Sequence, residues 1–507
     1  MSRNIPYPDR AKPPVPRCAE PTGGAPVTQD ASADRFHTGS HDLPVSDALA
    51  AFMSDRWAAS PLPDLALSDI GPWTAKRRAR LSARFPGERL VIPSGVLKVR
   101  SNDCDYRFRP HTAYAYLTGE QEPDSVLVME PVGGTHEALL HLRPRSVRDT
   151  GAFFRDRRYG EFWVGRRPTL DEAATMLGID CVHLDTLEDR LKKGGVPTRV
   201  LAGVDPAVDA VVSEPGETDR NRELAQYLSE MRLIKDEWEV AQLQLAVDHT
   251  TAGFTDVVRA LPAALGHHRG ERWIEGVFDL RARAEGNGTG YDTIAASGAH
   301  ACVLHWIRND GKLDPKQLLL LDAGVETDSL YTADITRTLP LSGRFSSAQR
   351  EAYQLVLDAQ QAGIDALRPG ASFRDFHQAA MRVIAEGLHS WGILPVRAEE
   401  SLRPESGLHR RYTLCSSGHM LGMDVHDCAK ARAETYLDGK LEVGHVLTVE
   451  PGLYLQPDDE TLPVELRGMG IRIEDDLVIT EDGARLMSSA LPRDPDAIEE
   501  WMGTLAG

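Results

Sequence analysis

Two acidic residues lie in neighbouring apolar, strand-like segments in the second half of this 507-residue chain. The run Leu318–Leu321 ends in Asp322, and the segment LYTADITRT places Asp334 in the middle of a second expected strand. If the two strands form a hairpin with its tip near Asp328, these acids lie directly opposite each other. Carboxylates that close repel and desolvate each other unless a cation lies between them. The segment is therefore either a metal site or a polar hairpin with one acid in its turn and another on a solvated face.

Three further segments of the same half carry residue types that ligate metals. They are SSGHMLGMDVHD with His419 and His426, VLTVEPGLYL with Glu450, and GIRIEDDLVIT with Arg472 and Glu474. In the last segment apolar and charged residues alternate, so Arg472 and Glu474 are expected on one face of a strand. A lone histidine or strand-end glutamate is more often structural, so only the combination is informative.

The combination supplies two aspartates, one histidine and two glutamates, each on or beside an apolar strand. Hard oxygen ligands with one imidazole suit Mn²⁺, Co²⁺ or Zn²⁺ in a two-metal arrangement. Two such metals about 3.5–4 Å apart can bridge a water, lower its pKa and polarise a carbonyl. That is hydrolytic chemistry, and no G-x-S-x-G, H-E-x-x-H or P-loop motif competes with it.

Size and composition limit the class of protein. A chain of 507 residues predicts two domains, and a formal net charge of −19 argues against nucleic acid as the main partner. No run of about 18 apolar residues occurs, so we expect no membrane-spanning helix. The first residues lack the apolar stretch of a secretory signal. The six cysteines are scattered without a C-x-x-C pair, which favours a reducing, cytoplasmic location.

Patterning divides the chain into three regions. Residues 1–46 are rich in Pro, Gly, Ser, Asp and Ala without a regular period, and are predicted to be a disordered tail. Residues 47–220 mix strand and helix patterns, which predicts an α/β domain. Residues 221–507 begin with long helical patterns and hold every metal-type segment. The glycine-rich GNGTGYD fails the phosphate-loop spacing and is predicted to be a turn.

The ordered set DAG…DITRT, GHMLGMDVHD, TVEPGLY and GIRIEDD resembles the aminopeptidase P and prolidase family of metallopeptidases. The resemblance implies a pseudo-symmetric α/β catalytic domain, the pita-bread fold shared with creatinase and methionine aminopeptidase, over about residues 225–490. It also implies an N-terminal α/β domain over about residues 48–190. In that domain, RPHTAYAYLTG is similar to a strand-and-turn segment of aminopeptidase P.

The resemblance also implies roles for individual residues. Asp322 would bind one metal, Asp334 and Glu474 would bridge both, and His419 and Glu450 would complete the second. A hydroxide held between the metals would be the nucleophile, with Glu450 as proton acceptor. The remaining roles would fall to His305 beside the scissile bond, His426 as hydrogen-bond partner of substrate and tetrahedral intermediate, and Arg472 as the residue that orients the carboxylates.

Two positions depart from the family pattern. Asp322 and Asp334 are 12 positions apart (334 − 322), one more than in several relatives, and the insertion falls in a turn where extra length costs little. Cys415 stands where many relatives carry another histidine, which bears on a contact either behind the ligands or in the substrate channel and not on the metal ligands themselves.

The resemblance therefore predicts a cytoplasmic Xaa-Pro aminopeptidase with two divalent ions, Mn²⁺ being the expected metal. Its expected partners are peptides with proline second and further copies of itself, as a dimer or tetramer. A prolidase, which cuts only Xaa-Pro dipeptides, could share both domains and all five ligands. A metal-free interaction protein is disfavoured because no ligand is missing, and creatinase-like activity is disfavoured on the same ground. The large N-terminal domain disfavours methionine aminopeptidase.

Overall fold

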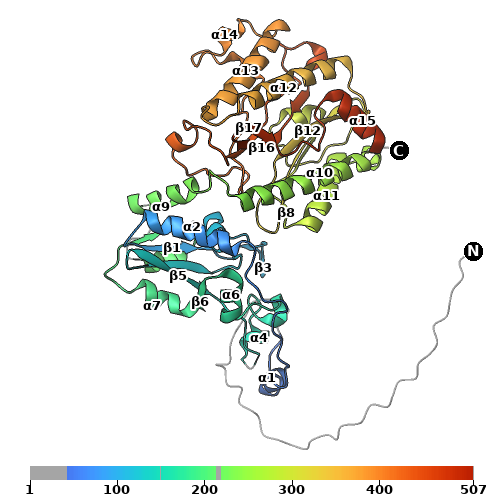
Figure 1. The fold of residues 1–507 in the computed structure, drawn as a ribbon. Coiled ribbons are helices and arrows are strands. Elements are labelled where there is room, and N and C mark those ends of the chain that lie inside the picture. The colour runs from blue at the N-terminus through green and yellow to red at the C-terminus, as the bar shows by residue number, and fades with distance from the viewer. Residues whose placement is uncertain (1–42, 149, 213–217, 506–507) are drawn as a thin grey trace, which may run out of the picture.

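The computed structural model describes residues 43–505 apart from 149 and 213–217. The chain forms an N-terminal part, coloured blue to green in Figure 1, and a C-terminal part, coloured green to red, which lie end to end. Residues 1–42 of the predicted tail lie outside the described residues, and the predicted boundaries after residues 46 and 220 stay predictions. None of the described helices is long and apolar enough to cross a membrane.

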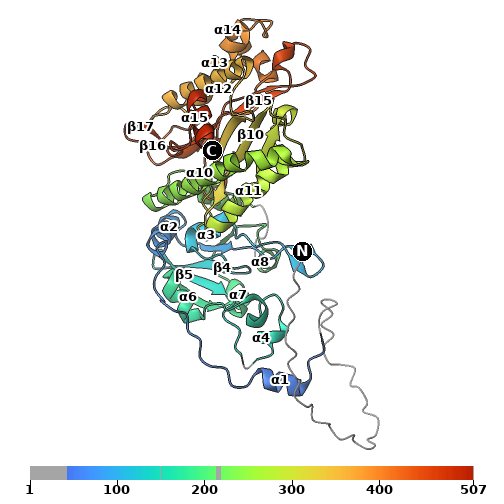
Figure 2. The same cartoon turned by 90° about the vertical axis from the view of Figure 1, so that its right-hand side faces the viewer.

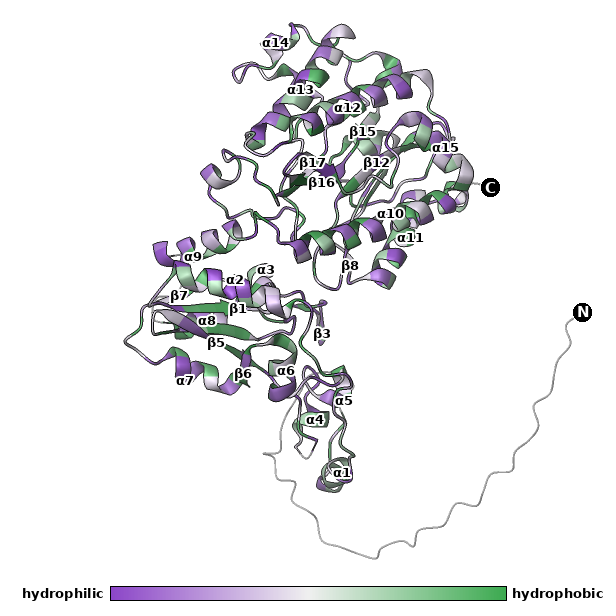
Figure 3. Cartoon of the chain, viewed as in Figure 1, coloured by the Kyte–Doolittle hydropathy of each residue, from purple (hydrophilic) through white to green (hydrophobic). Residues whose placement is uncertain are grey.

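The N-terminal part is built on a five-stranded mixed sheet with the order β6-β5-β4-β1-β7. Its strands are β1 (Arg89–Pro93), β4 (Val126–Val132), β5 (Thr135–Leu142), β6 (Asp180–His183) and β7 (Thr198–Val200). The three central strands pair antiparallel, whereas β6 and β7 run parallel to their neighbours. Every residue of β1 is buried, because helices cover the sheet on both faces, and Figure 3 shows this strand as strongly apolar.

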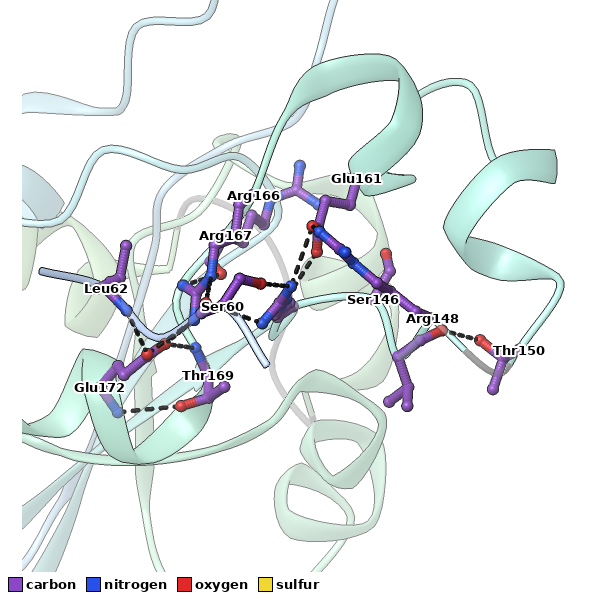
Figure 4. Close-up of polar contacts among 12 residues, drawn as sticks. Ser60, Leu62, Ser146, Arg148, Thr150, Glu161, Arg166, Arg167, Thr169 and Glu172 are labelled. Carbon is purple, nitrogen blue, oxygen red and sulfur yellow. Dashed lines mark hydrogen bonds and ion pairs between the residues drawn. The ribbon is translucent and has the colours of Figure 1, made fainter. Parts of the chain in front are cut away.

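Short helices and a small ribbon surround this sheet. They are α1 (Asp47–Met53), α2 (Gly71–Arg84), α3 (Thr112–Thr118), α4 (Ala152–Arg155), α5 (Glu161–Val164), α6 (Leu170–Leu177), α7 (Leu187–Leu191), α8 (Pro206–Val211) and α9 (Asp219–Glu230), with β2 (Val99–Ser101) paired to β3 (Cys104–Asp105). Arginines hold the segment between α1 and α2: Arg145 Nη2 donates to Ser60 Oγ at 2.6 Å and Arg166 Nε to Ser60 O at 2.9 Å (Figure 4). Helices α1 and α4 lie at the end of the N-terminal part that faces away from the C-terminal part (Figure 1).

The segment RPHTAYAYLTG forms helix α3, so the predicted strand and turn is wrong there. His111 caps the helix by accepting a hydrogen bond from the amide of Ala113, and Gly119 ends it with a φ of 73°, which glycine adopts without strain. Tyr114 and Tyr116 are buried in the core. The caps favour a helix over the extended conformation that these aromatic residues otherwise prefer.

The C-terminal part repeats one arrangement, a pair of long helices followed by an antiparallel sheet. The first copy consists of α10 (Glu237–Gly266), α11 (Gly270–Glu285), β9 (Ile294–Ser297), β10 (Leu318–Ala323) and β12 (Ile335–Pro340). The second consists of α12 (Ser347–Ala366), α13 (Phe373–Ser390), β13 (Val446–Val449), β16 (Asp475–Thr480) and β17 (Gly483–Leu486). The strands lie between the two helix pairs (Figures 1 and 2), which is the pseudo-symmetric α/β arrangement predicted from the sequence.

Shorter elements complete this part: β8 (Gly288–Thr289) paired with β11 (Val325–Glu326), β14 (Gly452–Leu455) paired with β15 (Met469–Arg472), α14 (Ala398–Ser401) and α15 (Pro495–Leu505). The GIRIEDD segment is thus two strands, β15 and β16, with a break at Ile473 and Glu474. The break lets Glu474 leave both ladders and enter the space between the sheets.

The register of β10 against β12 differs from the prediction. Asp322 pairs with Thr336 and not with Asp334. The amide of Thr327 donates to Tyr331 O at 2.9 Å and closes the turn, so the turn is centred on residue 329 and not on Asp328. Each residue of β10 therefore pairs with a residue two positions later in β12 than predicted. A shift of two keeps both acids on the same face of the hairpin, because side chains alternate with a period of two.

Glu120, directly after α3, gives the N-terminal part a pH-dependent stability. Its carboxylate is buried and accepts a hydrogen bond from the Tyr114 hydroxyl, and burial raises the pKa of Glu120 from 4.5 to about 8. The folded state therefore holds this proton more tightly than the unfolded state. The resulting stabilisation is fully present below about pH 4.5 and is lost as the pH rises through about 8.

We expect Glu120→Gln to flatten the fall in melting temperature between about pH 5 and about pH 9, because the amide needs no proton to stay neutral. Thermal unfolding at a series of pH values measures this. The exposed Glu137→Gln serves as the control and should leave the wild-type profile unchanged. Parallel profiles for wild type and Glu120→Gln would contradict the expectation.

Candidate active site

The residues singled out in the sequence come together around one cavity of about 290 Å³ in the C-terminal part. Those in its wall are Asp322, Asp334, His419, Glu450 and Glu474, together with His305, His426 and Arg472. The other lining residues are Tyr291, Asp292, Ile294, Leu304, Ile307, Cys415, Val425 and Tyr454. Strands or strand ends from both halves of the repeat deliver the acids, which is why segments far apart in the sequence meet here.

Asp334, His419 and Glu474 form the tightest group. Each offers one ligand atom, and the three atoms lie within 4.8 Å of one another. The Nε2 atom of His419 lies 3.3 Å from Asp334 Oδ2 and 3.4 Å from Glu450 Oε1. The opposite ring nitrogen, Nδ1, lies 3.2 Å from the carbonyl of Met420, and this contact turns Nε2 toward the acids.

Asp322 is held on the other side of the cavity by Arg472 and Tyr291. Arg472 Nη2 donates to Asp322 Oδ2 at 2.5 Å, and its Nη1 donates to the hydroxyl of Tyr454 at 2.9 Å. The Tyr291 hydroxyl lies 2.6 Å from an oxygen of Asp322 and 2.6 Å from an oxygen of Asp334. Arg472, expected to orient carboxylates from the strand face of Glu474, thus contacts Asp322 directly.

Hydroxyl groups and a further acid fix the remaining carboxylates. Thr336 Oγ1 donates to Glu474 Oε2 at 2.7 Å, and the amide of Asp334 donates to Asp476 Oδ2 at 3.1 Å. Asp476 is completely buried behind the cavity. These contacts set the backbone positions and carboxylate orientations before any ligand binds.

The cavity holds more acidic than basic side chains. Burial, together with the charges of the neighbouring acids, raises the pKa of Glu474 well above its usual range and that of Glu450 to about 7. Burial also raises the pKa of Asp322, although Arg472 opposes that shift. For His419, burial lowers the pKa, but Asp334 and Glu450 outweigh it and bring it to about 9. Hard oxygen donors with one imidazole and an excess of acidic side chains fit divalent cations.

His305 and His426 lie at the exposed rim of this cavity. The His426 ring packs edge-on against the ring of His419, with centroids 4.4 Å apart. Partial burial, followed by the charge of His419, lowers the pKa of His426. Both rim histidines can therefore reach a molecule that enters from solvent, while His419 faces the acids.

Sequence reasoning missed two residues that build the site. Tyr291 lies in the GNGTGYD segment, which was predicted only as a turn. Glu271, on α11, is fully buried and organises the loop that carries His305. It accepts four hydrogen bonds from that loop and its flanks: Ser297 N (2.9 Å), His300 Nδ1 (2.7 Å), Trp306 Nε1 (2.9 Å) and Gly311 N (2.7 Å). No local pattern marks either residue, because their partners come from distant segments.

Both parts of the chain match known protein families. Residues 241–481 match metallopeptidase family M24, and residues 74–197 match the aminopeptidase P N-terminal domain. The chain is 55% identical to Xaa-Pro aminopeptidase 1 of Streptomyces coelicolor, over 91% of this chain and 93% of that protein. It is 32% identical to the Xaa-Pro aminopeptidase of Escherichia coli, over 84% and 96% of the respective chains.

Solved structures agree with these matches. An aminopeptidase of Pseudomonas aeruginosa superimposes with a TM-score of 0.76 at 28% identity, covering 87% of this chain and 99% of that one. Zinc-substituted aminopeptidase P of E. coli in complex with product gives a TM-score of 0.75 at 30% identity, covering 86% and 99%. The chain belongs to the M24 metallopeptidases. Within them it has the two-domain architecture of aminopeptidase P, so the predicted family and fold class are confirmed.

The tight group predicts which substitutions release metal. We expect Asp334→Ala and Glu474→Ala each to lose most bound metal, because each removes a central oxygen donor and leaves the remaining acids to repel one another. Mass spectrometry of the metal content per chain measures this. Asp482→Ala, an exposed acid on the turn after β16, is the control and should retain the wild-type content. Wild-type metal content in both cavity variants would contradict the expectation.

Proposed function

We propose that this protein is a metallo-aminopeptidase that hydrolyses the bond between an N-terminal residue and a following proline. The convergence of Asp322, Asp334, Glu450 and Glu474 with His419 in one cavity carries this proposal. Membership of the M24 metallopeptidases supports it, as does 55% identity to a protein named Xaa-Pro aminopeptidase.

The metal ligands in this proposal follow the predicted set. Asp322 would hold one of two divalent ions, Asp334 and Glu474 both, and His419 and Glu450 the second. When bound, such ions supply Lewis-acid chemistry, which polarises a carbonyl and lowers the pKa of water. We propose Mn²⁺ as the native metal, because four oxygen-donor side chains outnumber the single imidazole.

The chain's own groups would bind and orient the peptide and move its protons. Glu450, whose Oε1 lies 3.4 Å from His419 Nε2 in the cavity wall, would accept a proton and return it. His305 and His426 at the rim would donate hydrogen bonds to the cleaved amide and to the oxygen that gains charge in the transition state. Arg472 would keep Asp322 in place through its 2.5 Å contact.

Proline as the second residue fits the remaining wall of the cavity. Its amide nitrogen carries no hydrogen, so it needs no acceptor from the enzyme. The apolar part of the wall consists of Ile294, Leu304, Ile307 and Val425, with the ring of Tyr454. A pyrrolidine ring can pack against these side chains and leave none of its own polar groups unpaired.

A prolidase would need to capture the free carboxylate of its dipeptide, usually with a cation. Arg472 is the one lysine or arginine among the described residues that line the cavity, and its guanidinium already contacts Asp322 and Tyr454. The arginines ahead of the histidine loop are exposed and line no part of the cavity: Arg397, Arg403, Arg410 and Arg411. This favours an aminopeptidase, which leaves room for the chain beyond proline.

We also propose a cytoplasmic homo-oligomer. Large apolar side chains of the N-terminal part are exposed, with Phe52 at 79% and Phe162 at 61%, and their burial against further copies would be favourable. Light scattering would give the number of chains. All five described cysteines are unpaired, which is consistent with a reducing compartment.

Metal reconstitution tests the cofactor. After complete chelation, we expect activity on an Xaa-Pro peptide to vanish and Mn²⁺ to restore more of it than Co²⁺, Zn²⁺ or Mg²⁺. The oxygen-rich ligand set is the reason. Initial rates with each metal added back, normalised to bound metal, measure this. Full activity in protein verified to be metal-free would refute the proposed function.

Substrate length separates the aminopeptidase from the prolidase. We expect Xaa-Pro-Xaa and longer peptides to be cleaved with a kcat/KM at least equal to that for the Xaa-Pro dipeptide, because the one Lys or Arg among the described cavity residues, Arg472, already contacts Asp322 and Tyr454. The measurement is kcat/KM across peptides that share their first residue. Cleavage of the dipeptide alone would reassign the protein as a prolidase.

A further inference from the structure

Arg109 lies in the N-terminal part, between β3 and α3, and its guanidinium reaches into the C-terminal part. Its Nε donates to Glu326 Oε2 at 2.8 Å, and its Nη2 donates to the carbonyl of Met423 at 2.5 Å. Three residues later, Thr112 Oγ1 donates to Asp424 Oδ1 at 2.6 Å. One planar guanidinium thus joins two separate segments of the C-terminal part, a geometry that a lysine ammonium does not reproduce.

The first of these segments is the hairpin that carries Asp322 and Asp334. Glu326 is buried in this hairpin and forms a backbone bridge with Thr332, two residues before Asp334. The amide of Thr332 donates in turn to the carbonyl of Gly422 at 3.1 Å. A displacement of Glu326 is therefore transmitted both to an acid of the cavity and to the loop that carries the histidines.

The second segment is the loop that ends in His426. Met423 and Asp424 precede that histidine by three and two residues and lie in irregular backbone. The end of the loop is fixed by the buried carboxylate of Asp427, which accepts hydrogen bonds at 3.0 Å from Arg232 and from Lys235. Just before His426, the Met423 side chain is buried in the core and Arg232 lies 3.6 Å from Asp424 Oδ2. The N-terminal part adds the shorter hydrogen bonds of Arg109 to the Met423 carbonyl and of Thr112 to Asp424.

We propose that Arg109 is a positioning residue, which sets the spacing between the acid-bearing hairpin and the loop of His426. The inference rests on the proposed function, because it assigns Arg109 the task of aiming His426 at the bond to be cleaved. Other contacts hold the two parts together without touching these segments. Arg77, for example, pairs with Asp236 at the start of α10 at 2.8 Å.

Arg109→Lys keeps the positive charge but cannot bridge both segments. We expect it to lower kcat on an Xaa-Pro peptide roughly ten- to a hundredfold, the cost of misplacing a reacting group by about 1 Å. KM should stay within about twofold. Arg107→Met is the matched control, since Arg107 donates to Asn287 O across the same boundary and touches neither segment. The control should keep the wild-type kcat, and both variants should keep their metal content.

A double-mutant cycle tests whether Arg109 acts through His426. In a His426→Ala background, Arg109→Lys should cause little further loss of kcat, because the group that it positions is already absent. If the two substitutions lowered kcat by independent factors that multiply in the double variant, the inference would be overturned. An unchanged kcat of Arg109→Lys accompanied by a lower melting temperature would also overturn it. Loss of bound metal in step with activity would also overturn it, by moving the effect from His426 to the metal ligands.

Hydrogen–deuterium exchange provides a readout that does not depend on activity. We expect faster exchange in peptides that cover residues 328–334 and 420–428 of Arg109→Lys, and wild-type exchange there in Arg107→Met. Unchanged exchange in Arg109→Lys would overturn the inference. If the wild-type protein failed to cleave Xaa-Pro peptides, the proposed function would fall, and the exchange data would still decide whether Arg109 fixes these segments.

Discussion

Mutual repulsion among four carboxylates in one cavity is the constraint on which the rest of the structure depends. At an effective dielectric constant near 20, two unit charges about 4 Å apart repel by about 4 kcal/mol, and ligand oxygens of Asp334 and Glu474 lie within 4.8 Å of each other. The nearby cationic groups are Arg472, 2.5 Å from Asp322, and His419, whose pKa rises to about 9. Two cationic groups cannot balance the acids if all of them are ionised, and burial beside like charges accordingly raises the pKa of both Glu450 and Glu474. Divalent ions would remove this repulsion, in keeping with membership of a metallopeptidase family.

Such a cavity keeps its shape only if its walls resist opening. Behind it, Arg337 is fully buried and donates to Asp475 Oδ1 at 2.6 Å and to the carbonyl of Glu474 at 2.6 Å. Arg337 therefore connects β12, which begins directly after Asp334, to β16, which begins directly after Glu474. Breaking a buried pair of this kind costs about 3–5 kcal/mol. The back of the site is therefore rigid, and the loops at its rim, with His305 and His426, remain open to a peptide.

The N-terminal part is joined to this machinery by charged and aromatic groups and not by a flexible tether alone. Arg77 lies 2.8 Å from Asp236 and 3.5 Å from Glu239, and the hydroxyl of Tyr331 donates to Glu239 at 2.8 Å. Tyr331 stands three residues before Asp334. Arg77 on α2 is therefore linked to the hairpin of Asp322 and Asp334 through the buried carboxylate of Glu239, which both Arg77 and Tyr331 contact. The architecture shared with aminopeptidase P has a physical consequence here: the N-terminal part supports the backbone of the site in the C-terminal part.

The sequence by itself determined the α/β fold class and the residue types of the site. Helix starts are local in this sense: Thr169 and Ser346 each form a capping box with a residue three positions later. Apolar strands that end in acids revealed the ligand types in the same local way. Only the tertiary structure decided the register of the hairpin and the parts played by Tyr291, Glu271 and Arg109. Arg109 and Asp424 are 315 positions apart, and such contacts arise from the packing of whole elements, which leaves no periodic trace in either segment.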